Sequence, residues 1–243
     1  FGTVGSDQLG KFQLCIYDVC VNMEYHATDI PNLQNVEHMD YMFSNHIIHE
    51  DEPDLAFDFP SVFDGNLGDW DVSNVTNMEA IFLNCDAFNG DISGWDVSNV
   101  TDMSAMFAGA ESFNKDLSNW NVSNVTDMGA LFNGAYSFNA DISGWDVSNV
   151  TNMSNMFAYA SAFNADISEW NVSNVTNMNG MFSHHTTFNG DLSNWDVGSV
   201  TDMAGMFYYS ESFNGNISGW DVSNVTNMVL MFSGAQSFNM DIG

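Results

Sequence analysis

The sequence predicts an α/β repeat solenoid, right-handed, with one parallel sheet, short helices and 25 residues per turn. All seven tryptophans stand 25 residues apart, at positions 70, 95, 120, 145, 170, 195 and 220. The residues around each tryptophan recur with the same period, as in WDVSNVTDMSAMFAGAESFN, which begins at Trp95. A fixed period of this length is typical of repeat proteins, in which each unit buries its apolar face against its neighbours.

Composition supports a folded chain. Of its 243 residues 45% are hydrophobic, enough for a sizeable core, so disorder is not expected. No apolar run approaches the roughly 18 residues of a membrane-spanning helix, and no such span is expected. Because the chain begins at Phe1 without a signal-peptide pattern, we expect a mature or trimmed form.

Charge restricts the possible partners. The chain has 32 acidic residues, two lysines and no other basic residue except histidine, and its net charge is −30. Phosphates of nucleic acids and anionic lipids would be repelled by such a surface. The charge instead favours cations, basic partners or a salty medium that screens repulsion. Nucleic acid is therefore excluded as a partner.

The first half of each unit predicts a short strand. In one unit the spacing Ile92-x-x-Trp95-x-Val97 indicates a strand entered through a bend, with Trp95 and Val97 facing inward. We expect the strands of successive units to pair in parallel at about 4.8 Å.

The second half predicts a helical turn. Val100, Met103, Met106 and Phe107 step by three and four residues, as along one face of a helix. Thr101 and Asp102 precede it and can cap its N–H groups, and a small segment such as residues 108–110 ends it.

Recurring methionines and phenylalanines predict the core. Twelve of the sixteen methionines and fifteen of the twenty phenylalanines fall in two positions each of the repeat. Such regular positions indicate core packing rather than cofactor binding. Cys85 occupies a position held by alanine in most other units, so we expect a small buried residue and not a nucleophile.

Residues 1–62 depart from the period and predict an N-terminal cap, with a degenerate repeat near Val36–Phe43 and an acidic insertion at residues 49–60. Residues 63–243 form about seven repeats. Within the cap, Cys15 and Cys20 are close enough in sequence for a disulfide, although two reduced thiols fit as well.

The repeat WDVSNVTDMSxMFxGAxxFNxDIS resembles the BspA-type repeat of bacterial surface lipoproteins, which also occurs in mycoplasmas, protists and marine algae. The resemblance covers residues 63–243 and implies a fold related to leucine-rich repeats, with a cell-surface or secreted protein that serves adhesion and protein interaction. The residues before Cys15, Phe12-Gln13-Leu14, lack the small residues of a lipid-attachment motif, so no lipid anchor is expected.

Two acidic positions of the repeat are candidate calcium ligands, because Ca²⁺ binds several oxygen atoms. The first comprises Asp71, Asp96, Asp146, Asp196 and Asp221, and the second Asp91, Asp116, Asp141, Asp166 and Asp191. The alternative is that these carboxylates, with neighbouring asparagines such as Asn89 and Asn114, bind turn backbone. No DxDxDG calcium loop is present.

Asn-Val-Thr triplets match the glycosylation sequon at six positions: Asn74, Asn99, Asn124, Asn149, Asn174 and Asn224. Because the triplet belongs to the repeat, a structural role is the alternative. A sugar on a few of them requires a eukaryotic secretory route.

No catalytic residue set departs from the repeat, so the expected function is a non-enzymatic, extracellular or surface-displayed module that binds a protein or glycan. His184-His185 replaces Gly-Ala in one unit and is expected to be a surface variation. One alternative function is an assembly subunit, for example in an organelle lumen, that docks through an uncapped C-terminal edge at Met240–Gly243. A calcium-dependent adhesin is the other.

Overall fold

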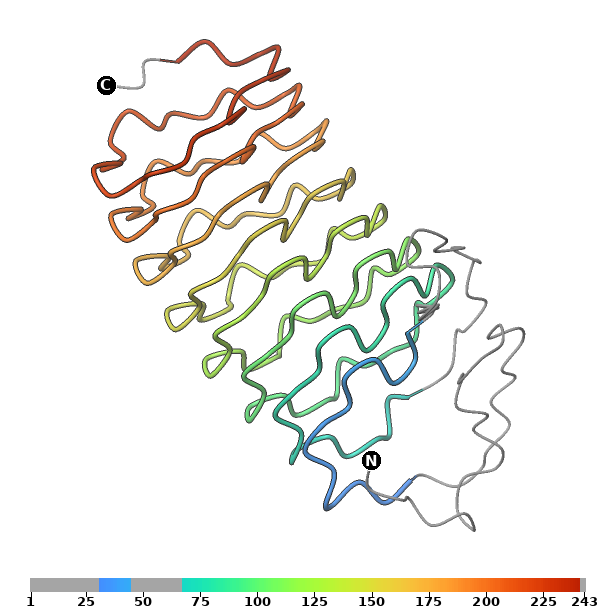
Figure 1. Cartoon of the computed structure of the whole chain (residues 1–243). Helices are drawn as coiled ribbons and strands as arrows, with labels where there is room; N and C mark the ends of the chain where they lie inside the picture. The colour runs from blue at the N-terminus through green and yellow to red at the C-terminus, as the bar shows by residue number, and fades with distance from the viewer. Residues whose placement is uncertain (1–30, 45–66, 241–243) are drawn as a thin grey trace, which may run out of the picture.

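The computed structural model describes residues 31–44 and 67–240. In these residues the chain winds into coils that stack along one axis, from the coil near residue 31 to the coil that ends at 240 (Figure 1). Seven parallel single-residue bridges connect the coils: His38–Asn77, Asn77–Asp102, Asp102–Asp127, Asp127–Asn152, Asn152–Asn177, Asn177–Asp202 and Asp202–Asn227. From Asn77 onward each bridge joins residues 25 positions apart, so one repeat makes one coil.

The predicted α/β solenoid with one parallel sheet and short helices is wrong. Throughout residues 31–44 and 67–240 the chain forms no helix, no extended strand and no sheet, only turns and the isolated bridges. The predicted strand at Ile92–Val97 contains a turn, in which the Trp95 N–H donates to the Ile92 carbonyl at 3.1 Å. Parallel pairing does occur, but at the predicted helical turn and through single residues.

Backbone conformation explains why residues 100–110 form no helix. Ala105 and Gly109 have positive φ angles of 53° and 69°, which a right-handed helix does not contain. The N–H groups of Met106 and Ala108 donate to carbonyls three residues earlier, at 3.2 and 3.0 Å. Overlapping turns also bring residues i and i+3 to the same side of the chain. They therefore produce the same three-residue spacing of apolar side chains that predicts a helix.

Alternate N–H groups leave the coil and bind the next one. Those of Met103, Ala105 and Phe107 donate to the carbonyls of Asp127, Gly129 and Leu131, at 3.0, 2.7 and 2.9 Å. The backbone hydrogen bonds of one coil are thus completed by its neighbours, which is how a stack without sheet or helix satisfies its buried polar groups.

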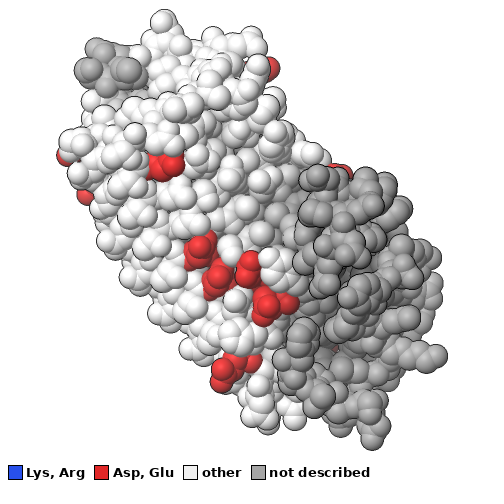
Figure 2. All heavy atoms as spheres, viewed as in Figure 1, with Lys and Arg blue, Asp and Glu red and all other residues white. Residues whose placement is uncertain are grey.

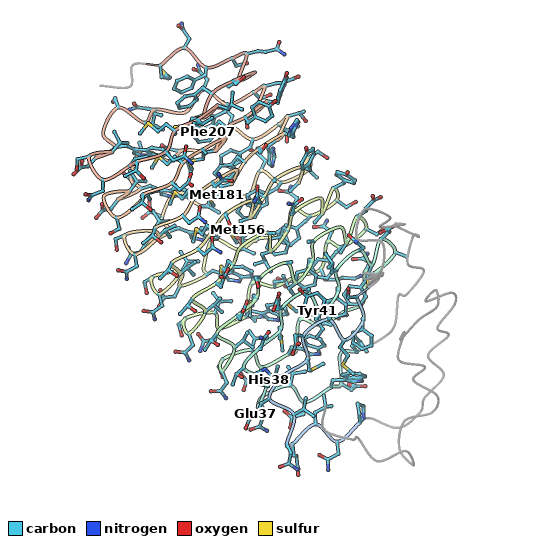
Figure 3. The ribbon with its side chains drawn as sticks, in the orientation of Figure 1. Glu37, His38, Tyr41, Met156, Met181 and Phe207 are labelled. Carbon is cyan, nitrogen blue, oxygen red and sulfur yellow. The ribbon has the colours of Figure 1, made fainter. Side chains whose placement is uncertain are left out.

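The core runs along the inside of the stack. Ile92, Trp95, Val97, Met103 and Phe107 are all at most 3% exposed, which confirms the predicted inward-facing positions. Met156, Met181 and Phe207 are among the buried side chains labelled in Figure 3. Cys85 is buried as predicted.

Phenylalanines from successive coils stack face to face in two columns. Phe107 lies 5.6 Å from Phe132 with nearly parallel rings, and Phe113 lies 6.1 Å from Phe138. Within one coil, Phe107 and Phe113 are 4.1 Å apart. Stacked rings in this distance range attract one another beyond the area that they bury.

The segment 31–44 packs on the first regular coil, since the Met39 N–H donates to the Asn77 carbonyl at 3.0 Å and Phe43 stacks on Phe82 at 5.6 Å. Most of the predicted cap, including Cys15, Cys20 and residues 49–60, lies outside the described residues. The division at residue 62 therefore stays a prediction. None of the described residues forms a helix that is long and apolar enough to cross a membrane.

Candidate functional site

Both predicted calcium positions are exposed turns. Asp91 Oδ1 accepts the Ser93 N–H at 3.0 Å and the Ser93 hydroxyl at 2.7 Å. Asp71 makes the same pair of bonds with Ser73 at 3.1 and 2.6 Å. In this Asx turn the side chain takes the place of a backbone carbonyl.

These bonds lower the pKa of the carboxyls below the usual value for Asp, because the serine hydroxyl and N–H stabilise the charged form. The lowering holds for Asp71, Asp91, Asp96, Asp116, Asp141, Asp146, Asp166, Asp191 and Asp221. Asp196 makes a shorter version of the turn, accepting the Gly198 N–H at 3.1 Å.

The carboxylates of each candidate calcium position occur at most once per coil and, in the described part of the chain, do not form a metal-binding cluster. Within residues 31–44 and 67–240, no group of three His, Cys, Asp or Glu side chains is placed to hold a metal ion. Figure 2 shows acidic side chains grouped over the N-terminal coils of one face, where no lysine or arginine is visible. A metal ion bound at the two positions stays a prediction.

Sequon asparagines connect the coils. The Nδ2 atoms of Asn99 and Asn124 each donate to a serine carbonyl of the preceding coil at 2.7 Å, Ser73 and Ser98 respectively. Asn149, Asn174 and Asn224 make the equivalent bond, also at 2.7 Å. Asn74 is exposed in the first regular coil. Nδ2 is the atom to which a sugar attaches, and in these five residues it already donates a hydrogen bond to the preceding coil.

A third position of the repeat also holds Asp or Asn. The sequence predicts a helix-capping role for it, at Asp102, whereas the structure places it at the bridges between coils. It comprises Asn77, Asp102, Asp127, Asn152, Asn177, Asp202 and Asn227, the residues that form the bridges between coils. Asp102 Oδ1 accepts the Ser104 N–H at 2.9 Å, and Asn152 Nδ2 donates to Asp127 Oδ1 at 3.0 Å. The sequence does contain a sign of these contacts: when the repeats are aligned, this position holds both Asp and Asn. Such a mixture favours hydrogen bonds between coils, because an Asn amide can donate to the carboxylate of a neighbouring Asp.

One edge of the stack departs from the repeat. We call it the variable edge and define it by three positions of each repeat. The central position comprises residues 84, 109, 134, 159, 184, 209 and 234. The other two positions are the residue immediately before each central residue and the residue two positions after it. In every coil from residue 67 onward the central position has positive φ. That position is glycine at 109, 134 and 234, and it is Asn84, Tyr159, His184 or Tyr209 in the other coils. Only glycine adopts this conformation without strain.

The N-terminal part of the variable edge is hollowed. A groove of about 410 Å³ is lined by Leu83, Asn84, Asp86, Ala108, Gly109, Glu111, Asn133, Gly134 and Tyr136. Gly109 and Gly134 line it without a side chain, and the Tyr136 side chain, which also lines it, is 47% exposed.

Further along, aromatic side chains occupy the same central position. Tyr159 stacks on His184 with ring centroids 4.5 Å apart, and His184 stacks on Tyr209 at 5.3 Å. Tyr208 lies edge-on to His184 at 5.2 Å. Tyr159 and Tyr209 are each 44% exposed, and their φ angles are 60° and 52°. We call Tyr159, His184 and Tyr209 the aromatic row.

The prediction that His184-His185 is a surface variation is wrong for His185. That side chain is fully buried, and its ring packs edge-on against Phe163, Phe182 and Phe188. Its Nδ1 accepts the Phe188 N–H at 3.1 Å, whereas Nε2 has no hydrogen-bond partner. Burial lowers the pKa of His185 from 6.5 to about 4.

The last described coil carries exposed apolar side chains. Val229 is 66% exposed and Leu230 57%, in positions that hold Ala204 and Gly205 one coil earlier. Met228 is 42% exposed, whereas the equivalent Met203 is fully buried by the coil that follows it.

Comparison with known proteins identifies the repeat. The model of the family described as "Mycoplasma protein of unknown function, DUF285" matches the chain twice, over residues 54–149 and 138–243. No curated protein and no solved structure gives a significant match. The two matched segments are tandem, and together they span more than three quarters of the 243 residues. This chain of stacked 25-residue coils therefore belongs to the DUF285 family.

Proposed function

We propose that the chain is a non-enzymatic binding module, secreted or displayed on a cell surface, that binds a macromolecular partner through its variable edge. The aromatic row supports this most directly. Glycine occupies the same backbone position in other coils and would avoid the strain, of about 1–2 kcal/mol per residue, that a side chain meets at positive φ. The stack therefore does not require Tyr159, His184 and Tyr209 for its own folding. Exposed, strained residues of this kind concentrate at functional sites.

The regularity of the other positions strengthens this assignment. Core positions and Asx turns repeat in nearly every coil, because each coil must match its neighbours. Loops carried by a rigid scaffold, in contrast, are where binding residues gather. The BspA-type resemblance, which we infer to be a distant relationship to the DUF285 family, is the basis for proposing a surface or secreted location.

Binding to a panel of immobilised extracellular matrix proteins and polysaccharides tests the proposal. The edge variant combines Tyr159→Gly, His184→Gly and Tyr209→Gly, which substitutes the residue that Gly109 and Gly134 show to be compatible with the fold. Tyr41→Gly is a matched control, because Tyr41 is 45% exposed at a φ of 57° but lies outside the variable edge.

We expect the wild-type chain to bind at least one member of the panel, the edge variant to lose that binding, and Tyr41→Gly to retain it. Binding that survives in the edge variant, or no binding to any member, would overturn the proposal.

A second candidate function, assembly with another copy of the chain, has its own observation. Val229 and Leu230 are an apolar pair at two repeat positions that hold only small or polar residues in the coils from Glu79 to Gly205. Light scattering after size exclusion tests it with the double variant Val229→Asn and Leu230→Gly, the residues found at positions 179 and 180. Concentration-dependent association in the wild type that this variant abolishes supports assembly, and a wild type that stays monomeric excludes it.

A further inference from the structure

We propose that the variable edge binds an extended polypeptide segment bearing arginine or lysine side chains, which lies along the axis of the stack. The inference rests on the proposed binding function and adds the class of partner. It starts from two features that adjoin on this edge: the groove over Gly109 and Gly134, and the aromatic row in the coils that follow.

Charge complementarity favours a cationic segment. Glu111 lines the groove and is exposed, and Glu211 is exposed at the same repeat position beside the end of the aromatic row. Lys115 is the single lysine or arginine among the described residues. With a net charge of −30, the chain attracts a basic segment over long range and repels phosphate, sulfate and acidic peptides.

The aromatic rings suit the same side chains. Tyr136, Tyr159 and Tyr209 are between 44% and 47% exposed. Tyr159 and Tyr209 each stack one ring face on His184, and the Tyr209 ring also lies close to Gly234, so we expect a cation to contact the rings of Tyr136 and Tyr159. A guanidinium or ammonium group over the face of such a ring is attracted by the negative charge of its π-system. A carboxylate nearby adds a charge-assisted hydrogen bond, and arginine can make both contacts at once.

The dimensions fit an extended segment. Parallel chains lie about 4.8 Å apart, so the four steps from the coil of Gly109 to that of Tyr209 span roughly 19 Å. An extended peptide advances roughly 3.3 Å per residue, and about six residues cover this distance. Gly109 and Gly134 present no side chain to the peptide at one end, and the rings contact its side chains at the other.

The test uses a fluorescein-labelled octapeptide of alternating arginine and glycine, with fluorescence anisotropy in about 0.15 M salt, where screening limits contacts between distant exposed charges. Glu111→Gln removes one charge inside the groove, and Glu169→Gln removes one exposed charge at another repeat position. Tyr159→Gly and Tyr159→Asn remove a ring of the aromatic row, with Tyr41→Gly as the matched control. Asn84 shows that asparagine is also compatible with this position.

We expect Glu111→Gln and both Tyr159 variants each to weaken binding about two- to five-fold, which corresponds to about 0.5–1 kcal/mol. The two control variants should change it less than two-fold, on the order of the variation seen for isolated surface charges. Unfolding midpoints of every variant show whether the fold is intact, and because two replacements are tested at Tyr159, loss of one to misfolding still leaves a result.

Equal weakening by Glu111→Gln and Glu169→Gln would show non-specific attraction and overturn the inference. Tighter edge-dependent binding of maltoheptaose, a neutral oligosaccharide, would also overturn it, since the partner would then be a glycan. In that case the proposed binding function stands. If instead panel binding survives in the triple edge variant, the proposed function itself fails.

Discussion

The indole Nε1 of Trp145 donates a hydrogen bond to the carbonyl oxygen of Leu117, one coil earlier, at a distance of 3.0 Å. Every tryptophan from Trp95 to Trp220 makes the equivalent bond, to the residue 28 positions before it. Trp145 is 4% exposed and also stacks on Trp170 at 6.5 Å. The recurring tryptophan thus fills the core and satisfies a buried carbonyl of the neighbouring coil.

Replacing Trp145 by phenylalanine should lower the free energy of unfolding by about 1–3 kcal/mol, because the carbonyl of Leu117 loses its donor inside the stack. Urea unfolding measures the change. Val147→Ala is the control, since it removes buried apolar atoms of the same coil without affecting a hydrogen bond. A loss below about 0.5 kcal/mol for Trp145→Phe would contradict the role of the indole N–H.

His185 should make the stability of the chain pH-dependent. Its pKa is about 4 in the folded chain and near 6.5 when unfolded, so between these values only the unfolded chain binds the proton. Stability from this residue is therefore complete above about pH 6.5 and decreases as the pH falls towards 4, by about 3 kcal/mol in all.

Unfolding at pH 7 and pH 5 tests this for the wild type, His185→Ala and the neighbour variant His184→Gly. Alanine is the residue found at positions 110, 135 and 160, so the coil accommodates it. We expect the wild type and His184→Gly to lose about 2 kcal/mol more than His185→Ala on acidification. An identical loss in all three chains would show that other groups account for the pH dependence.

Gly134 has a φ angle of 68°, and a Cβ added there would meet its nearest atom only at 3.7 Å. Gly134→Ala therefore isolates backbone strain from crowding and should destabilise by about 1–2 kcal/mol. Gly144 is not among the glycines with positive φ, and a Cβ added there would have no atom within 4 Å. Gly144→Ala should instead stabilise by about 0.4–1 kcal/mol, because it restricts the unfolded chain. Thermal unfolding compares the two variants, and a shift in the same direction for both would contradict the positive φ of Gly134.

Asn124 should be sensitive to loss of its amide. Asn124→Asp replaces the Nδ2 donor with a carboxylate that faces the Ser98 carbonyl, and because this bond is exposed to solvent the change should cost about 0.5–1.5 kcal/mol. Asn124→Ser is milder, because Ser199 occupies this position in one coil of the chain. If denaturant unfolding finds equal, negligible effects for both, the bond between the coils is not contributing to stability.

Calcium tests the two acidic columns. In the Asx turns Oδ1 of each carboxylate already accepts the N–H of the serine, or of Gly198, two residues further on. Millimolar calcium and magnesium should therefore raise the unfolding temperature by similar small amounts through screening. A ligand that binds only the folded chain raises stability by about 2.7 kcal/mol at a hundred times its Kd. A large rise specific to calcium would establish the columns as metal sites, and the double variant Asp96→Asn with Asp146→Asn should then abolish it.

Much of the packing could be predicted from the sequence. The 25-residue period placed Trp95, Val97, Met103 and Phe107 in the core, and all of them are buried. Apolar spacing could not distinguish a helix from overlapping turns, since both bring residues three apart to one side. The turns differ from a helix in the positive φ angles of residues such as Ala105. Nothing in the sequence indicates such an angle at an alanine.

Candidate sites were predictable in part. The period marked Asp91 and Asn99 as recurring polar residues, but which groups they bind depends on coils that pack side by side only after folding. Of the variable edge, the repeat pattern indicated only the replacement of Gly-Ala by His184-His185, because the groove and the aromatic row form only when residues 25 positions apart are stacked.

By itself, then, the sequence determined the period, the buried positions, the acidic surface and the membership of a repeat family, because these follow from composition and spacing. The tertiary structure alone decided that each coil is made of turns, that Trp145 bonds to Leu117, that His185 is buried and that Tyr159, His184 and Tyr209 form one surface. The physical reason is that each coil completes its backbone hydrogen bonds on its neighbours. Its local conformation is therefore selected by the stack and not by the residues of one repeat.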